Sequence, residues 1–391
     1  MSLASLHSAA VADRRVERRV SFPRRDGSRL ALLSSPQAAA LIEEWRDLAR
    51  SSAEENVFFH PGMLLPAIDH LDGGIRIAAV RGSEGRLIAL APVDAVRFGR
   101  VAPAVRLWVH DFAAVGSPLI DAGALAAGAE AIVDGLPGDG SLIVPALPLD
   151  GPVAAALAAA ARAAGRPVHV VGAHWRAVLG RAVAGDGLRA ALPSRRRGDF
   201  ARQMRRLGER GTVALEVTGE PDRVRARFEE FLWLEARGWR GQRGLALVST
   251  AAYAAFARDV VFNRSERGTV RLASIRFGER PVAIAVAFVA GATAYAWRLT
   301  YDADFARYSP GAQLMLDLPG SLLEDPDVAM IDSCSPAGDR FAASLWPDRM
   351  SVGTLVVGPP GGSLLHNAGL AAFRAEIEAR AAARRLRTRL A

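Results

Sequence analysis

A faint internal repeat constrains the fold of this chain more than any other feature of its sequence. The stretch IRIAAVRGSE (75–84) aligns without gaps with VRLASIRFGE (270–279), and each copy is followed by a second apolar strand, LIALAPV (87–93) or VAIAVAFV (282–289). Two strand patterns separated by a short turn are typical of a β-hairpin. Helical patterns precede each hairpin, and further strands and a helix follow it. The repeat therefore predicts two related α/β halves.

The surrounding patterns place the two halves at residues 29–184 and 185–363. We expect a disordered basic arm at residues 1–28 and a basic helix at residues 364–391. Near the junction of the halves, Arg195–Arg210 predicts a basic connecting helix, which is either a solvated linker or a surface for an anionic substrate. The chain has 391 residues, half of them hydrophobic, which is ample for two domains with their own cores.

Composition argues against several classes of function. No apolar run approaches the roughly 18 residues of a membrane-spanning helix. The Arg-rich start is unlike a secretory signal, so we expect a cytoplasmic protein. Cys334 is the only cysteine, which excludes an internal disulfide, and the seven scattered histidines predict no metal site.

The positive charge of the chain is a weaker guide to its partners. The net charge is +8, and basic proteins often bind nucleic acid or anionic surfaces. All 49 basic residues are arginine, however, and a complete absence of lysine indicates a coding bias rather than an adaptation for binding. Nucleic acid, tRNA in particular, is therefore kept only as a minor alternative partner.

A candidate anion-binding turn lies in TYDADFARYSPGAQLML (300–316), which follows a predicted strand and opens a helix. Ser309 can act as the N-cap, and Pro310 can take the first helical position. The amides of Gly311 and Ala312 would then lack helical partners and point outward. A helix N-terminus carries about half a positive elementary charge, so a phosphate group can bind there.

The second half resembles the GNAT acyltransferase superfamily in the order of its helices and strands and in this turn. The closer resemblance is to a bacterial branch of CelD-type acetyltransferases, linked to cellulose and exopolysaccharide synthesis. The residues that support it are EARGWRGQRG (235–244), TYDADFARYSPG (300–311), Ile331-Asp332 and Trp346, within about residues 195–358. FemABX-type aminoacyltransferases are similar in pairing two such halves.

The resemblance implies an α/β fold of two tandem GNAT-like halves, each with a mixed, mostly antiparallel sheet flanked by helices. It also implies that an acyl-CoA, such as acetyl-CoA, is the acyl donor. No metal ion is expected to take part. The implied cofactor-binding residues are Thr300, Arg307, Ser309, Gly311 and Ala312. The pantetheine arm would lie between the strands that end at Thr300 and Ile331, and it would bond to them as an added strand does.

Direct acyl transfer needs a base for the acceptor, a donor to the oxyanion and a proton for the departing thiolate. The candidate bases are Asp302 and Glu235, Asp332 is a further candidate at a strand end, and Tyr301 is a candidate proton donor. Each has a plainer interpretation. Asp302 can simply form a turn, Glu235 can pair with the neighbouring Arg237, Asp332 can cap a loop, and Tyr301 can be a packing residue.

Departures from the family pattern leave three functions open. Pro310 cannot donate an N–H to a phosphate, and Arg340-Phe341 stand where the branch has a Tyr-Lys pair. We expect an acyl-CoA-dependent transferase that acts on a sugar, amino sugar or polysaccharide precursor, that is, a small-molecule or glycan acceptor. The alternatives are a FemABX-like transferase that uses an aminoacyl-tRNA, and a non-catalytic scaffold of a polysaccharide synthase.

Overall fold

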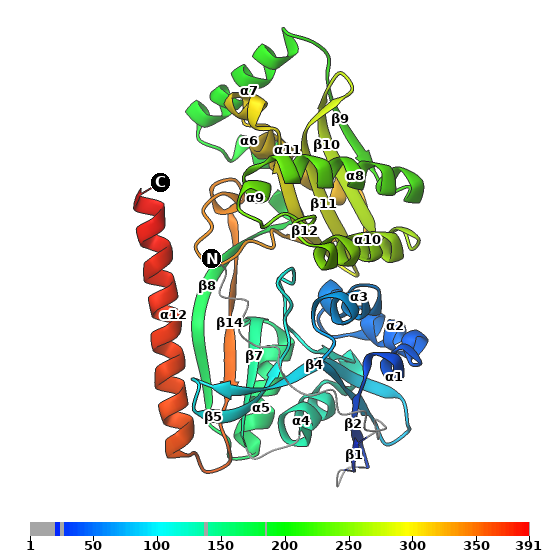
Figure 1. Ribbon diagram of the computed structural model, residues 1–391, viewed down its shortest axis with the longest axis vertical. Coiled ribbons are helices and arrows are strands. Elements are labelled where there is room, and N and C mark those ends of the chain that lie inside the picture. The colour runs from blue at the N-terminus through cyan, green and yellow to red at the C-terminus, as the bar shows by residue number, and fades with distance from the viewer. Residues whose placement is uncertain (1–19, 24–26, 137–139, 184–185, 391) are drawn as a thin grey trace.

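The computed structural model describes residues 20–23, 27–136, 140–183 and 186–390. Most of the basic arm predicted at residues 1–28 lies outside these ranges. Figure 1 shows two lobes stacked along the long axis, the N-terminal half in one and most of the C-terminal half in the other. The chain thus has the two α/β halves that the repeat predicts.

The N-terminal half begins with strands, continues through helices and then alternates between the two. Its strands are β1 (Val20–Pro23), β2 (Arg29–Leu33), β3 (Arg76–Arg81), β4 (Leu87–Phe98), β5 (Ala102–Leu107), β6 (Leu119–Ile120), β7 (Ser141–Pro148) and β8 (Val168–Gly180). Its helices are α1 (Ser35–Ala39), α2 (Ile42–Ser51), α3 (Pro61–Leu71), α4 (Leu125–Gly135) and α5 (Pro152–Ala163), with short 3-10 turns η1 (Val57–Phe59), η2 (Ala122–Ala124) and η3 (Arg181–Val183).

The C-terminal half begins with helices and, like the first half, has helices immediately before its hairpin and further strands after it. Its strands are β9 (Val213–Thr218), β10 (Val270–Phe277), β11 (Arg280–Ala290), β12 (Thr293–Tyr301), β13 (Met330–Asp332) and β14 (Asp348–Val357). Its helices are α6 (Asp186–Ala190), α7 (Ser194–Gly208), α8 (Pro221–Arg237), α9 (Trp239–Gln242), α10 (Ala251–Ser265), α11 (Pro310–Leu322) and α12 (Leu364–Leu390), with η4 (Ala303–Tyr308) and η5 (Ala342–Ser344). The predicted basic helix near residue 200 is α7, and the predicted C-terminal helix is α12.

The strands of both halves join in one sheet of 14 strands. Their order is β1-β2-β3-β4-β5-β7-β14-β8-β13-β12-β11-β10-β9, with β6 attached to β4. Both predicted hairpins, β3–β4 and β10–β11, are antiparallel pairs. The parallel pairs among the described strands are β5 with β7 and β12 with β13. A mixed and mostly antiparallel sheet confirms the predicted fold class.

The closing strands of the two halves are interleaved. Strand β8 of the first half lies between β14 and β13, and strand β14 of the second half lies between β7 and β8. Their antiparallel register runs from Val178 opposite Asp348 to Val168 opposite Val357, and Figure 1 shows these two long strands passing from one lobe to the other. A boundary at residue 184 therefore divides the chain but does not divide the sheet.

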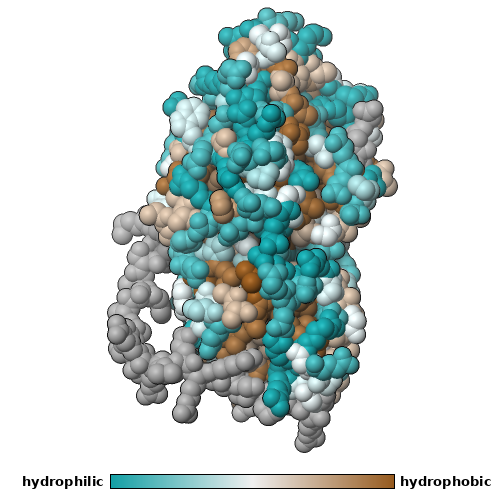
Figure 2. All heavy atoms as spheres, turned by 90° about the vertical axis from the view of Figure 1, so that its right-hand side faces the viewer, coloured by the Kyte–Doolittle hydropathy of each residue, from teal (hydrophilic) through white to brown (hydrophobic). Residues whose placement is uncertain are grey.

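Buried apolar residues from both halves form one core cluster at the interface of the lobes. Helix α3 packs against α10, and the Phe58 ring lies 5.5 Å from the ring of Tyr295 on β12. The face shown in Figure 2 is mostly hydrophilic, with hydrophobic residues in smaller patches. This shared core fixes the position of β12 relative to the N-terminal half, because apolar burial holds both sides together.

His110 is a buried polar group in this interface. Its ring packs against Phe58 and Trp108 of the first half and against Phe256 of the second, with centroid distances of 5.3 to 6.4 Å. Neither ring nitrogen has a hydrogen-bond partner among the described residues. Burial lowers the pKa of His110 to about 3, since the imidazolium would lose its hydration in an aromatic pocket.

This lowered pKa predicts that His110 contributes to acid sensitivity. The unfolded chain binds a proton at His110 below about pH 6.5, whereas the folded chain does not until about pH 3. Stability is therefore fully present above pH 6.5 and falls below it by up to about 1.4 kcal/mol per pH unit. We expect His110→Phe to reduce this slope, measured by urea unfolding at pH 7.5, 6 and 5. An unchanged slope would show that His110 is protonated in the folded chain.

Two classes of feature are missing from the described ranges of the chain. No helix there is both long enough and apolar enough to cross a lipid bilayer. Within the same ranges, His, Cys, Asp and Glu side chains do not gather in groups of three or more that could hold a metal ion.

Candidate functional site

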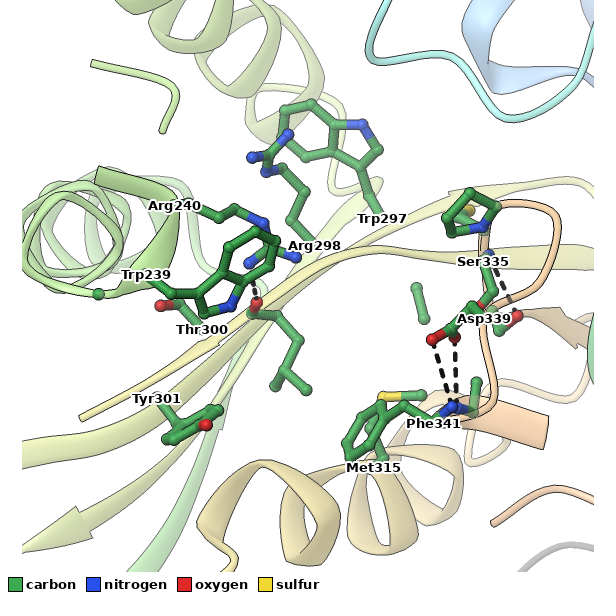
Figure 3. Close-up of a pocket in the computed structure, with 17 residues that line it drawn as sticks. Trp239, Arg240, Trp297, Arg298, Thr300, Tyr301, Met315, Ser335, Asp339 and Phe341 are labelled. Atoms are coloured by element: carbon green, nitrogen blue, oxygen red, sulfur yellow. Dashed lines mark hydrogen bonds between the residues drawn. The ribbon is translucent and has the colours of Figure 1, made fainter. Parts of the chain in front are cut away.

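The candidate site is a cleft that opens where β12 and β13 separate. The two strands pair in parallel from Thr293 with Met330 to Tyr295 with Asp332, and β12 then continues to Tyr301 without β13 beside it. The gap is a cavity of about 390 Å³. Residues of α9, β12, α11, η5 and the segment after β13 line this cavity (Figure 3). The gap predicted between the strands ending at Thr300 and Ile331 is thus present.

A bulge in β12 lies within the cleft. Val286 pairs with Arg298 and Phe288 pairs with Tyr295, so β12 has one more residue than β11 between these pairs. A bulge leaves an extra residue outside the ladder and re-aims nearby side chains. As a result, Trp297 and Arg298 both reach Phe112 of the first half. The indole Nε1 donates to the Phe112 carbonyl at 2.8 Å, and the guanidinium lies 5.4 Å from its ring centre.

Cys334 lies on the other wall of the cleft, just after β13. Its φ is +54°, a left-handed conformation that is uncommon for a residue other than glycine. Its N–H donates to Asp332 Oδ1 at 2.7 Å, which stabilises this turn. Burial, together with the negative charge of Asp332, raises the pKa of the thiol well above its usual range. Cys334 is therefore a poor nucleophile.

The start of α11 differs from the sequence prediction. Ser309 is left-handed, with φ +51°, and its side chain makes no capping hydrogen bond. Its carbonyl instead accepts the N–H groups of Ala312 and Gln313, each at 3.0 Å. The prediction of two outward-pointing amides was wrong, because Gly311 and Ala312 are both buried. The left-handed turn at Ser309 places the first helical turn beneath the end of β12.

Gly311 retains one feature of an anion site. Its N–H has no hydrogen-bond partner in the described parts of the chain. Tyr301 and Leu299 lie close to this residue, since a Cβ added at Gly311 would lie 3.3 Å from Tyr301 Cδ1 and 3.4 Å from Leu299 Cδ2. The absence of a side chain at Gly311 therefore allows β12 and α11 to approach each other without a tight contact.

The other predicted cofactor residues divide into two groups. Thr300 and Tyr301 line the cleft. Arg307 and Ser309 do not line it, and the guanidinium of Arg307 is exposed and lies 4.8 Å from the ring centre of Tyr308. The structure therefore brings the strand end, and not the whole predicted turn, into the cleft.

Asp302, the first candidate base, does not line the cleft. It is buried, and its Oδ2 accepts from Arg280 Nε at 2.9 Å. Its Oδ1 accepts the N–H of Asp304 at 3.1 Å and so caps η4. These contacts match the plainer interpretation of Asp302 as a turn-forming residue.

Glu235 is fully buried and forms an ion pair, although not with Arg237. Its Oε1 accepts from Arg298 Nε and Nη2 at 2.9 and 2.7 Å, and its Oε2 accepts the N–H of Leu247 at 2.8 Å. Arg240 Nη1 lies 3.8 Å from the same Oε1. Arg237 instead stacks on Trp233, 4.7 Å from its ring centre. A carboxylate bonded on both oxygens is positioned to orient Arg298, not to remove a proton from an acceptor.

Asp332 is also paired, across the two halves. It is 1 % exposed, and its Oδ2 accepts from Arg176 Nη1 of β8 at 3.2 Å. Its Oδ1 accepts the Cys334 N–H, as the predicted loop cap requires. Among the predicted catalytic residues, Tyr301 has a different setting. The residue is 39 % exposed, and its hydroxyl has no hydrogen-bond partner among the described residues.

Several residues of the cleft were missed as site candidates. Arg240, from the quoted stretch EARGWRGQRG, lines one wall beside Trp239, and Met315 and Phe341 line the opposite part. The signal that could have located Arg240 is the glycine spacing of that stretch. A Cβ at Gly241 would lie 1.7 Å from the Ala236 carbonyl oxygen, so the chain can turn back there only with glycine.

Comparison with known proteins identifies a domain within the C-terminal half of this chain. Residues 194–339 match the family model described as an acetyltransferase (GNAT) domain, and this segment contains all the residues that line the cleft except Phe341 and Ala342. This segment therefore has the character of a GNAT-type acetyltransferase domain. No curated protein matches the chain in sequence.

Solved structures extend the likeness over both halves. FemX is 10% identical with a TM-score of 0.52, covering 81% of this chain and 95% of FemX. A conserved protein of unknown function from Bacteroides thetaiotaomicron is 12% identical with a TM-score of 0.51, covering 82% and 97%. The C-terminal domain of a protein described as a lysylphosphatidylglycerol synthetase from Agrobacterium fabrum is 14% identical with a TM-score of 0.50, covering 87% and 96%. At these identities the likeness shows the fold alone.

Proposed function

We propose that this protein transfers an acyl group from an acyl-CoA, such as acetyl-CoA, to an acceptor in the cleft between β12 and β13. The observation that supports this most strongly is the cavity itself. It lies where two parallel strands part, and most of its lining belongs to the segment that matches the GNAT family model. The pantetheine arm contains two amides, and the unpaired edge of β12 beyond Tyr295 offers backbone groups of the kind that an added strand uses.

The proposed acceptor is a sugar, an amino sugar or a polysaccharide precursor. This part of the proposal rests on the resemblance to CelD-type acetyltransferases. A cytoplasmic location and a link to cellulose or exopolysaccharide synthesis likewise remain predictions.

The proposed mechanism does not use the three candidate carboxylates as bases. Asp302, Glu235 and Asp332 are each paired with an arginine. The Tyr301 hydroxyl is unpaired and its ring borders the cleft, but the ring also lies next to Gly311. We therefore propose that Tyr301 lies at the diphosphate end of the bound donor, and that its predicted role as proton donor to the thiolate passes to another group, because the thiolate lies at the other end of the pantetheine arm. The bulge in β12 supplies backbone groups outside the ladder, and an N–H there is our candidate for stabilising the oxyanion.

Cys334 provides a direct test of donor binding, because it is the only cysteine and lines the cleft. We expect saturating acetyl-CoA to slow the alkylation of Cys334 by iodoacetamide by about tenfold or more, since the donor would cover the thiol. The measurement is the rate of mass gain of the intact protein. As a control, the urea-unfolded chain should react at the same rate with and without acetyl-CoA. Equal rates in the folded chain would contradict the proposal.

An aminoacyl-tRNA donor is the second candidate, and it has one observation in its favour. Helix α7 is rich in arginine and contacts η4, and Arg210 just after it donates to the Tyr308 hydroxyl at 3.0 Å. A basic helix therefore lies next to the turn before α11. This candidate requires tRNA binding that weakens steeply as salt rises, because phosphate contacts release counterions. Binding of acetyl-CoA without transfer to any acceptor would instead favour the non-catalytic scaffold.

A further inference from the structure

The cleft contains an excess of positive charge on the wall formed by α9 and β12. Arg240 and Arg298 line this wall, and the carboxylate of Glu235 lies behind them. Glu235 is 0 % exposed, while the side chains of Arg298 and Arg240 are 14 % and 26 % exposed. Two guanidinium groups thus share one carboxylate, which leaves one positive charge in a largely desolvated setting.

Both arginines retain donors that no protein group uses. Arg298 bonds through Nε and Nη2, and Arg240 bonds through Nη1 to the Leu299 carbonyl at 2.7 Å. Among the described residues, Arg298 Nη1 and the Nε and Nη2 of Arg240 have no acceptor. Burial, followed by the charge of Arg298, lowers the pKa of Arg240. A partly buried charge without a counterion is costly, and an anionic ligand would relieve that cost.

The rest of the cleft does not supply the missing counter-charge. Asp339 lines the cleft, but Figure 3 shows it on the far side of the cavity from Arg240 and Arg298. Its carboxylate is already occupied, because it accepts the N–H of Phe341 at 3.2 Å and that of Ala342 at 3.5 Å.

The arginine pair and the Gly311 N–H lie on opposite faces of β12. Leu299 and Tyr301 point to Gly311 on the α11 face. Arg298 points to Glu235 of α8 and to Phe112 of the N-terminal half. A donor whose diphosphate bonds to Gly311 would therefore leave the arginine pair free for the second substrate.

We propose that Arg240 and Arg298 bind an anionic group, a carboxylate or a phosphate, of the acceptor substrate. This inference rests on the proposed transferase function and narrows its acceptor to an acidic or phosphorylated molecule. The planar forks of two arginines bind either anion through paired hydrogen bonds. A neutral sugar or a purely cationic amine would leave this charge uncompensated.

The charge of this wall can be measured with two alkylating reagents of nearly the same size. Iodoacetate is anionic and iodoacetamide is neutral, and both react with the single cysteine in the same cleft. We expect Arg240→Gln to lower the rate ratio of iodoacetate to iodoacetamide by roughly tenfold, because the positive wall concentrates the anion near Cys334. Arg240→Lys should keep most of the ratio, since it keeps the charge. Arg240→Gln also leaves the Arg298–Glu235 pair in place, so the variant should fold.

Arg243→Gln is the matched control. The Arg243 guanidinium lies 5.4 Å from the ring centre of Trp239, close to Arg240, but Arg243 is exposed and does not line the cavity. The ratio of the iodoacetate rate to the iodoacetamide rate in Arg243→Gln should equal that of the unmodified chain. An equal fall in the Arg240→Gln and Arg243→Gln variants, or no fall in either, would overturn the inference.

A second measurement tests whether Arg240 and Arg298 bind an anionic group of the acceptor or the phosphates of the acyl donor. The affinity for acetyl-CoA, measured by thermal shift, should change less than about threefold in Arg240→Gln. A loss of tenfold or more would assign the arginine pair to the donor phosphates and overturn the inference. Failure of acetyl-CoA to bind the unmodified chain would instead refute the proposed function, whatever the alkylation ratio shows.

Discussion

Replacing Gly311 with glutamate is expected to abolish the binding of acetyl-CoA. Tyr301 and Leu299 lie 3.3 and 3.4 Å from the position of a Cβ at Gly311, so a longer side chain must displace the Tyr301 ring and occupy its place. The new carboxylate would then lie at the helix N-terminus and repel the donor diphosphate. We expect the dissociation constant to rise by about 100-fold, or roughly 2.7 kcal/mol, measured by calorimetric titration.

The matched control for this experiment is Gly311→Ala. Its Cβ makes a tight contact with Tyr301, but the variant keeps the free N–H and adds no charge. It should bind acetyl-CoA within a few-fold of the unmodified chain. If Gly311→Glu folds and still binds acetyl-CoA normally, the diphosphate does not dock at this helix start, and the donor must enter the cleft elsewhere.

Replacing Asp332 with alanine is expected to cause the largest loss of stability among the substitutions considered. Asp332 and Arg176 have side chains that are 1 % and 5 % exposed, so the change leaves a buried guanidinium without its carboxylate. Removing one partner of a buried ion pair costs about 3–5 kcal/mol. It also leaves the Cys334 N–H without its acceptor. The urea midpoint of unfolding should fall accordingly.

Two further variants test the cause of this loss. The double variant Asp332→Asn with Arg176→Met removes both charges while an amide oxygen still accepts the Cys334 N–H, and it should recover at least half of the stability. Asp199→Ala breaks an exposed ion pair with Arg202 and should cost less than about 1 kcal/mol. A similar loss of stability in Asp332→Ala and Asp199→Ala would show that the buried ion pair contributes no more to stability than an exposed one.

The sequence predicted the fold well because the signals for it are local. The two hairpins, the helix that starts at Pro310 and the helices before each hairpin each follow from alternation or helical periodicity within a dozen residues. The interleaving of β8 and β14 was not predicted. It depends on pairing between residues about 170 to 190 positions apart along the chain, which no local pattern records.

The catalytic candidates were predicted less well, for the same reason. Glu235 and Arg298 are 63 positions apart, and Asp332 and Arg176 are 156 positions apart. From the sequence alone each carboxylate could have been a free base. The turn at Ser309 was likewise misread, because a serine before a proline predicts an N-cap, whereas packing under β12 imposes a left-handed backbone there.

The local patterns of the sequence specify the two α/β halves and the hairpins, and the family resemblance added the place along the chain where two strands part. The charges that remain unpaired in the resulting cleft depend instead on the tertiary structure. Side-chain type and spacing fix local hydrogen bonding and apolar patterning, so they specify helices and strands. The ionic state of a buried group depends on which distant residues fold against it, and here those residues left Arg240 and Arg298 with one carboxylate between them.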